Sequence, residues 1–94
     1  MMSDMNDRSA QDAYLGRVQG LRIAMGDYVS AESLTQVDSL IDHGEPAEGV
    51  CSLAWALYNA QVAVPGWVND DIRDLTDGIV DREHLPPPLP EIRD

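Results

Sequence analysis

A helix stop followed at once by a helix start most constrains the fold of this chain. Glycine takes the left-handed conformation that ends a helix at least cost, so we expect His43-Gly44 to end one, and Pro46 suits a first helical turn, where its missing amide would have no partner. Apolar residues repeat at helical spacing on both sides: Leu34, Val37, Leu40 and Ile41 before, and Val50, Leu53, Ala54, Leu57 and Tyr58 after. The pattern predicts a tight helical hairpin, with Ser30 as N-cap of its first helix and an end near Asn59.

One further helix is predicted before this hairpin and one after it. The first begins with Ser9 as N-cap and breaks at Gly26-Asp27; its apolar stripe is Leu15, Val18, Leu21, Met25 and Val29. The last begins at Pro65 or Gly66. At about 100° per residue, one side of it carries Val68, Ile72, Leu75 and Ile79, and the other carries Asp70, Asp74, Asp77 and Asp81.

The whole pattern indicates an all-α fold, a compact bundle of three to four helices with an extended Pro-rich C-terminal tail. No long alternating stretch argues for a sheet, and 94 residues suffice for one domain but not two. We expect residues 1–8 to be a flexible N-terminal tail and residues 9–84 a single helical domain. Residues 85–94 form the proline-rich tail, which we expect to lie extended across the domain.

The charge of the chain limits the classes of partner. Its 17 Asp and Glu residues face only 6 Arg and no Lys, which gives a net charge of −11. Such a chain repels nucleic acid and anionic membranes, so a basic protein is the expected partner. Between Ile23 and Ile72 eight acidic residues occur without a single Arg or Lys.

Two acidic patches are the candidate partner-binding sites. Carboxylates four residues apart on a helix repel each other, and a sequence selected for stability alone would mix in cations. The first patch is Asp38, Asp42, Glu45 and Glu48; the second is Asp70, Asp74 and Asp77, with Trp67 as an aromatic anchor. The alternative is that these acids only keep a small bundle soluble. Trp55 is expected in the core, since the chain has no Phe to fill it.

Catalytic, cofactor and metal signatures are missing from the sequence. There is no Gly-rich phosphate loop, no nucleophile elbow and no pair of His at ligand spacing. Cys51 is expected to be a small buried side chain, and His43 and His84 helix-end or surface residues. We therefore predict no enzyme activity, no cofactor and no metal. With no signal-peptide pattern and no long apolar run, we expect a cytoplasmic protein.

The stretch Val37-Asp38-Ser39-Leu40-Ile41-Asp42-His43-Gly44-Glu45-Pro46-Ala47-Glu48-Gly49 resembles the helix–turn–helix of small immunity proteins from bacterial polymorphic-toxin systems, notably the MafI-type family. The resemblance covers about residues 34–80. It implies a cytosolic helical protein that binds and neutralises a cognate toxin, often a nuclease. It carries over only the turn residues, which have a structural role, and no toxin-contacting residue.

Two functions follow as expectations. The first is a non-enzymatic acidic binding module, an immunity-type inhibitor that occludes the basic active site of a toxin. The second is a small helical structural or regulatory module, acting as a homodimer or as a subunit of a complex. An uncovered apolar face would favour the second function.

Overall fold

The predicted helical hairpin is present in the computed structural model, which describes residues 2–92, with side chains from residue 8 onward. Its helices are α2 (Ala31–Asp42) and α3 (Pro46–Asn59). The hydroxyl oxygen of Ser30 accepts a hydrogen bond from the main-chain amide of Ser33, in the first turn of α2, at 3.1 Å. Gly44 has φ +81°, so it takes the left-handed conformation that reverses the chain. The start and stop signals of the hairpin are confirmed.

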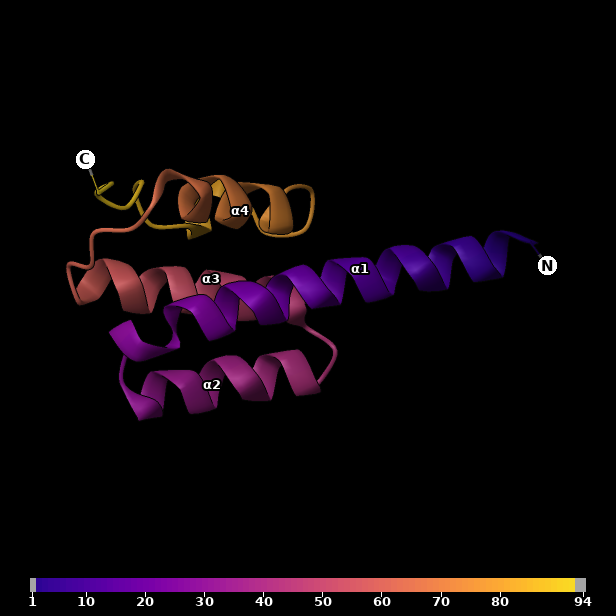
Figure 1. Cartoon of the computed structure of the whole chain (residues 1–94), viewed down its shortest axis with the longest axis horizontal. Coiled ribbons are helices and arrows are strands. Elements are labelled where there is room, and N and C mark those ends of the chain that lie inside the picture. The colour runs from indigo at the N-terminus through magenta and orange to yellow at the C-terminus, as the bar shows by residue number, and fades with distance from the viewer. Residues whose placement is uncertain (1, 93–94) are drawn as a thin grey trace.

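The chain folds as an all-α bundle, as predicted. Helix α3 packs against α2 on one side and α4 (Gly66–Thr76) on the other (Figure 1), and α1 (Met2–Met25) contacts both α3 and α4. The main core draws on all four helices and the C-terminal segment: Val18, Leu21, Met25, Val37, Val50, Leu53, Ala54, Leu57, Val64, Val68, Ile72, Leu75 and Leu89. Within the described residues, no helix combines the length and apolarity needed to cross a membrane.

Helix α1 begins earlier than predicted and projects past the other helices (Figure 1). The prediction that Ser9 caps it is wrong, because the helix already starts at Met2. Neither Gly nor Pro occurs between Met2 and Gly16, so nothing in the backbone chemistry interrupts the helix there. Its end before Gly26 is confirmed. The flexibility expected of residues 1–8 stays a prediction, and residue 1 lies outside the described part of the chain.

Helix α4 ends earlier than the apolar pattern predicted. Asp77 is extended (ψ 129°) and Gly78 has φ +75°, a conformation that favours glycine and turns the chain away from the helix axis. Ile79 and Asp81 therefore do not continue the two faces of α4. Ile79 is 63% exposed, and Val80 is buried in its place.

The proline-rich segment is extended, as predicted, and packs on the bundle. The Val64 amide donates a hydrogen bond to the Pro90 carbonyl, and the Val64 carbonyl accepts one from the Ile92 amide, both at 2.8 Å. These two bonds pair Val64 with Glu91 in an isolated parallel bridge. Leu89 is buried in the main core. The prolines do not end α4, because the Asp77-Gly78 turn has already done so. Residues 93–94 of the predicted tail lie outside the described part.

Gly49 sets the distance between α2 and α3, and its substitution gives a first prediction. A Cβ built there would lie 3.0 Å from Cγ1 of Ile41 and 3.3 Å from the carbonyl oxygen of Val37. We expect Gly49→Ala to lower the free energy of unfolding by about 1–2 kcal/mol, because two helix backbones would have to move apart. The measurement is urea denaturation followed by circular dichroism.

Gly20→Ala is the matched control. Gly20 is also helical, and a Cβ at its position would meet nothing within 4 Å. This substitution should raise the free energy of unfolding by up to about 1 kcal/mol. If Gly49→Ala raises the free energy of unfolding as Gly20→Ala does, α2 and α3 are not in close contact at Gly49.

Candidate functional site

The first predicted acidic patch is divided by an ion pair. Arg22 of α1 donates from Nε and from a terminal nitrogen to the two carboxylate oxygens of Asp38, at 2.9 and 2.8 Å. These two hydrogen bonds lower the pKa of Asp38 and raise that of Arg22. Asp38 is therefore neutralised by Arg22, which lies just outside the segment from Ile23 to Ile72 that contains no Arg or Lys. Its carboxylate holds α2 to α1.

This ion pair makes stability depend on pH, which gives a second prediction. The pKa of Asp38 is lower in the folded chain than in the unfolded chain, where it is about 3.9. The stabilisation is complete above that value and is lost as the pH falls through the lower, folded pKa. Wild type should therefore lose more stability than Asp38→Asn between about pH 5 and pH 3. Parallel curves from urea titrations at each pH would show that the pair adds no stability.

The other three residues of the first patch stay together at the α2–α3 turn. Asp42 ends α2, Glu45 precedes α3 and Glu48 lies in its first turn. All three are exposed, and among the described residues none has a cationic side chain at ion-pair distance. We call them the acidic turn. Asp38 does not belong to it, because its carboxylate is directed to α1.

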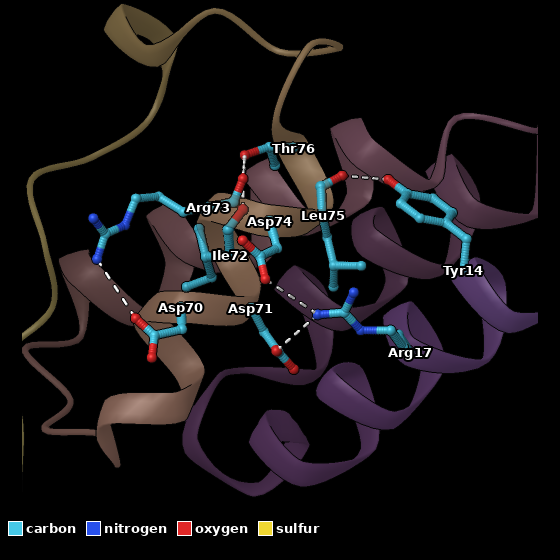
Figure 2. Close-up of polar contacts among 9 residues, drawn as sticks. All are labelled: Tyr14, Arg17, Asp70, Asp71, Ile72, Arg73, Asp74, Leu75 and Thr76. Carbon is cyan, nitrogen blue, oxygen red and sulfur yellow. Dashed lines mark hydrogen bonds and ion pairs between the residues drawn. The ribbon is translucent and has the colours of Figure 1, made fainter.

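The second predicted patch is also partly neutralised. Figure 2 shows Arg17 of α1 reaching two carboxylates of α4, Asp71 at 3.0 Å and Asp74 at 3.7 Å. On the other side of α4, Arg73 lies 3.6 Å from Asp70. These pairs are solvent-exposed and contribute little stability each. They nevertheless offset part of the negative charge that the sequence pattern assigned to this face, at Asp70 and Asp74.

Tyr14 adds a further link between α1 and α4. Its hydroxyl donates to the main-chain carbonyl of Leu75 (Figure 2). Burial raises the pKa of Tyr14, so the hydroxyl stays protonated and remains a donor at neutral pH. The face of α4 turned to α1 is therefore occupied by contacts within the chain.

Asp77 lies near the other acids of the second patch although it is outside α4. It lines a hollow of about 460 Å³ together with Asp70 and Asp74. Arg73 and Arg82 line the same hollow. The structure thus brings the three predicted acids together, but in a surface of mixed charge rather than an acidic one.

The two tryptophans both lie at the surface. Trp67, at the start of α4, is 46% exposed; its role as an anchor stays a prediction. The expectation that Trp55 fills the core is wrong, because this side chain is 37% exposed. Its indole N–H donates to the main-chain carbonyl of His84 at 2.7 Å, and its ring meets Tyr58 edge to face, with centroids 5.8 Å apart. The inner face of α3 is filled instead by Leu53 and Leu57.

A groove between α2 and α3 was missed by the sequence analysis. Its volume is about 510 Å³, and no residue that lines it carries a positive charge. We call it the α2–α3 groove; it is lined by Ser33, Gln36 and Leu40 of α2 and by Glu48, Cys51, Ser52, Trp55, Ala56 and Asn59 of α3. The available signal was the spacing of Glu48, Ser52, Trp55 and Asn59, which recur every three or four residues and so share one side of α3.

Cys51 lies at the bottom of this groove and is buried, as predicted. Burial raises the pKa of its thiol, and the carboxylate of Glu48 raises it further. The thiol is therefore protonated at neutral pH and a poor nucleophile. Its Sγ lies 3.5 Å from the same His84 carbonyl that accepts from Trp55.

The two histidines are exposed at helix ends, as predicted. His43 caps α2, with Nδ1 2.6 Å from the carbonyl oxygen of Ser39. His84 lies in a short 3₁₀ turn, Arg82–His84, and its ring is within 4.8 Å of the carboxylates of Asp81 and Glu83. All three ligand groups are exposed, and no hydrogen bond among the described residues orients them, as metal ligands require. We assign no metal to this trio.

Glu48 connects the acidic turn with the α2–α3 groove, since it belongs to both. Together they form a surface that carries negative charge, one exposed aromatic ring, that of Trp55, and no cationic side chain among its residues. Comparisons with protein-family models, with curated proteins and with solved structures gave no match for this chain.

Proposed function

We propose that this chain is a non-enzymatic, immunity-type inhibitor, which neutralises a toxin in the cytoplasm by covering the toxin's basic active site. One observation carries the proposal. Asp42, Glu45 and Glu48 are exposed within one turn, and no cation neutralises them in the described part of the chain, whereas Arg residues pair with four of the acids elsewhere, Asp38, Asp70, Asp71 and Asp74. The resemblance of this turn to MafI-type immunity proteins supports the same conclusion.

The mechanism is electrostatic and steric. A nuclease presents Arg and Lys side chains to hold phosphate groups, and these cations attract a concentrated set of carboxylates. The acidic turn is held by two helices, so its backbone loses little freedom on binding. Once docked, the helical hairpin occupies the space that the nucleic acid needs. No catalytic step by the inhibitor is required.

The test measures the activity of a purified candidate toxin domain of the nuclease class with and without the inhibitor. We expect the inhibitor to block the activity of that domain, with an affinity that falls between about 0.05 and 0.3 M salt as screening increases. Asp42→Lys and Glu45→Lys should weaken inhibition. Inhibition that is insensitive to salt and to both substitutions would exclude the electrostatic mechanism.

A homodimeric interaction module is a second candidate, favoured by one apolar hollow. It lies where α1 passes the α2–α3 turn, has a volume of about 500 Å³, and is lined by Ala10, Gln11, Tyr14, Leu15, Ile41, Gly44 and Pro46. Ile23 on the same helix is 74% exposed. This function requires a stable dimer, so light scattering at micromolar concentration decides it: a monomer excludes it.

A further inference from the structure

We propose that the α2–α3 groove receives an arginine-bearing helix of the basic partner. This inference rests on the proposed function and names the surface that makes the contact. The groove offers a floor of small side chains, Cys51, Ser52 and Ala56, with Glu48 toward one end and Trp55 further along α3. Small residues let another helix backbone approach closely, and a groove between two helices is a common receptor for a third.

Trp55 is suited to receive a cation rather than a hydrogen bond. Its indole N–H is already satisfied by the His84 carbonyl at 2.7 Å, so ring carbon is what it presents to a partner. Tyr58 fixes the ring by an edge contact with an interplanar angle of 86°. A guanidinium stacks on such a ring more readily than an ammonium does, because it is planar and less strongly hydrated.

Glu48 supplies the second contact at a defined spacing. Seven residues, or two helical turns, separate it from Trp55, which corresponds to about 10.5 Å along α3. A partner helix that lies along the groove meets this spacing with two arginines seven residues apart. One guanidinium pairs with the Glu48 carboxylate, and the other stacks on Trp55.

The probe is an alanine-rich helical peptide of about 20 residues, long enough to be helical in water, with two arginines seven positions apart. One control peptide carries lysines at the same positions. The other carries its arginines nine positions apart, on opposite helix faces. Binding to the ¹⁵N-labelled protein is followed at low salt by NMR, which detects weak complexes and separates the indole signals of Trp55 and Trp67.

We expect the first peptide to shift the Trp55 indole and the α3 amides from Glu48 to Asn59, and to leave the Trp67 indole unchanged. Trp55→Leu and Glu48→Gln should each weaken binding about threefold, the effect of one cation–π contact or one ion pair. Trp67→Leu and Asp27→Asn, which change exposed residues outside the groove, should not. Circular dichroism checks folding, and Glu48→Gln remains decisive if Trp55→Leu fails to fold.

Three outcomes would overturn the groove assignment. They are equal affinity for the lysine peptide, equal affinity for the peptide with opposed arginines, and shifts confined to residues outside the groove. The proposed function would survive any of them, since inhibition of the toxin is measured separately. Conversely, the peptide could bind in the groove while the protein fails to inhibit the toxin. That result would support the docking surface and contradict the proposed function.

Discussion

Replacing Asn69 with alanine is expected to lower the free energy of unfolding by about 2–3 kcal/mol and to release the C-terminal segment from the bundle. Asn69 is buried in α4. Its Nδ2 donates to the Leu89 carbonyl at 2.9 Å, and its Oδ1 accepts from the Leu89 amide at 3.0 Å. The side chain thus satisfies both main-chain groups of Leu89, as a neighbouring β-strand would. It also donates to Glu91 at 3.1 Å. Alanine would leave two buried main-chain groups of Leu89 without a partner.

Two measurements separate this effect from a general loss of stability. Urea denaturation gives the free energy of unfolding, and hydrogen exchange at the Leu89 amide reports whether the segment opens locally. Asn59→Ala is the matched control, because Asn59 is exposed at the end of α3 and should change stability by less than about 0.5 kcal/mol. Unchanged protection of the Leu89 amide in Asn69→Ala would contradict this account of the segment.

The bond between Asn69 and Leu89 also shows which parts of the fold the sequence could predict. Ser30 and Gly44 act on amides and carbonyls within a few residues, so their effect is readable from the local sequence. Asn69 acts on a residue 20 positions away, and no spacing rule connects the two. The extended shape of the tail was therefore predictable, whereas its integration into the core was not.

The end of α4 was missed for a different reason. The apolar period continues to Ile79, so counting by helical turns extends the helix past its true end. The turn at Asp77-Gly78 is a local signal that opposes the period, since glycine reaches positive φ without strain. Here the local backbone chemistry wins over the hydrophobic pattern, and Val80 rather than Ile79 is buried.

The acidic residues of the candidate site could be predicted from the sequence, but which of them are paired with Arg could not. The sequence shows a base-free stretch, yet Arg22 reaches Asp38 from 16 residues away and Arg17 reaches Asp71 from 54 residues away. Helix packing decides which carboxylates receive these cations. Once those pairs are set aside, the acidic turn is the part of the first predicted patch whose carboxylates form no ion pair within the described part of the chain.

Charge reversal at Asp42 is expected to have opposite effects on stability and on function. Asp42 is the last residue of α2, where a carboxylate faces the negative end of the helix dipole. Asp42→Lys replaces this unfavourable interaction with a favourable one, so it should raise the free energy of unfolding by about 0.5–1 kcal/mol. The same change places a positive charge against the basic partner and should weaken inhibition at least about tenfold.

Glu32→Lys separates this local effect from the change in net charge. Glu32 lies in the first turn of the same helix, where a carboxylate favours the helix dipole, so lysine there should lower stability and leave inhibition nearly unchanged. Both variants change the net charge by the same amount. If the acids only keep the bundle soluble, Asp42→Lys gains stability and loses no inhibition. A loss of inhibition confined to Asp42→Lys would instead mean that the chain keeps a destabilising carboxylate at this turn because the partner binds it.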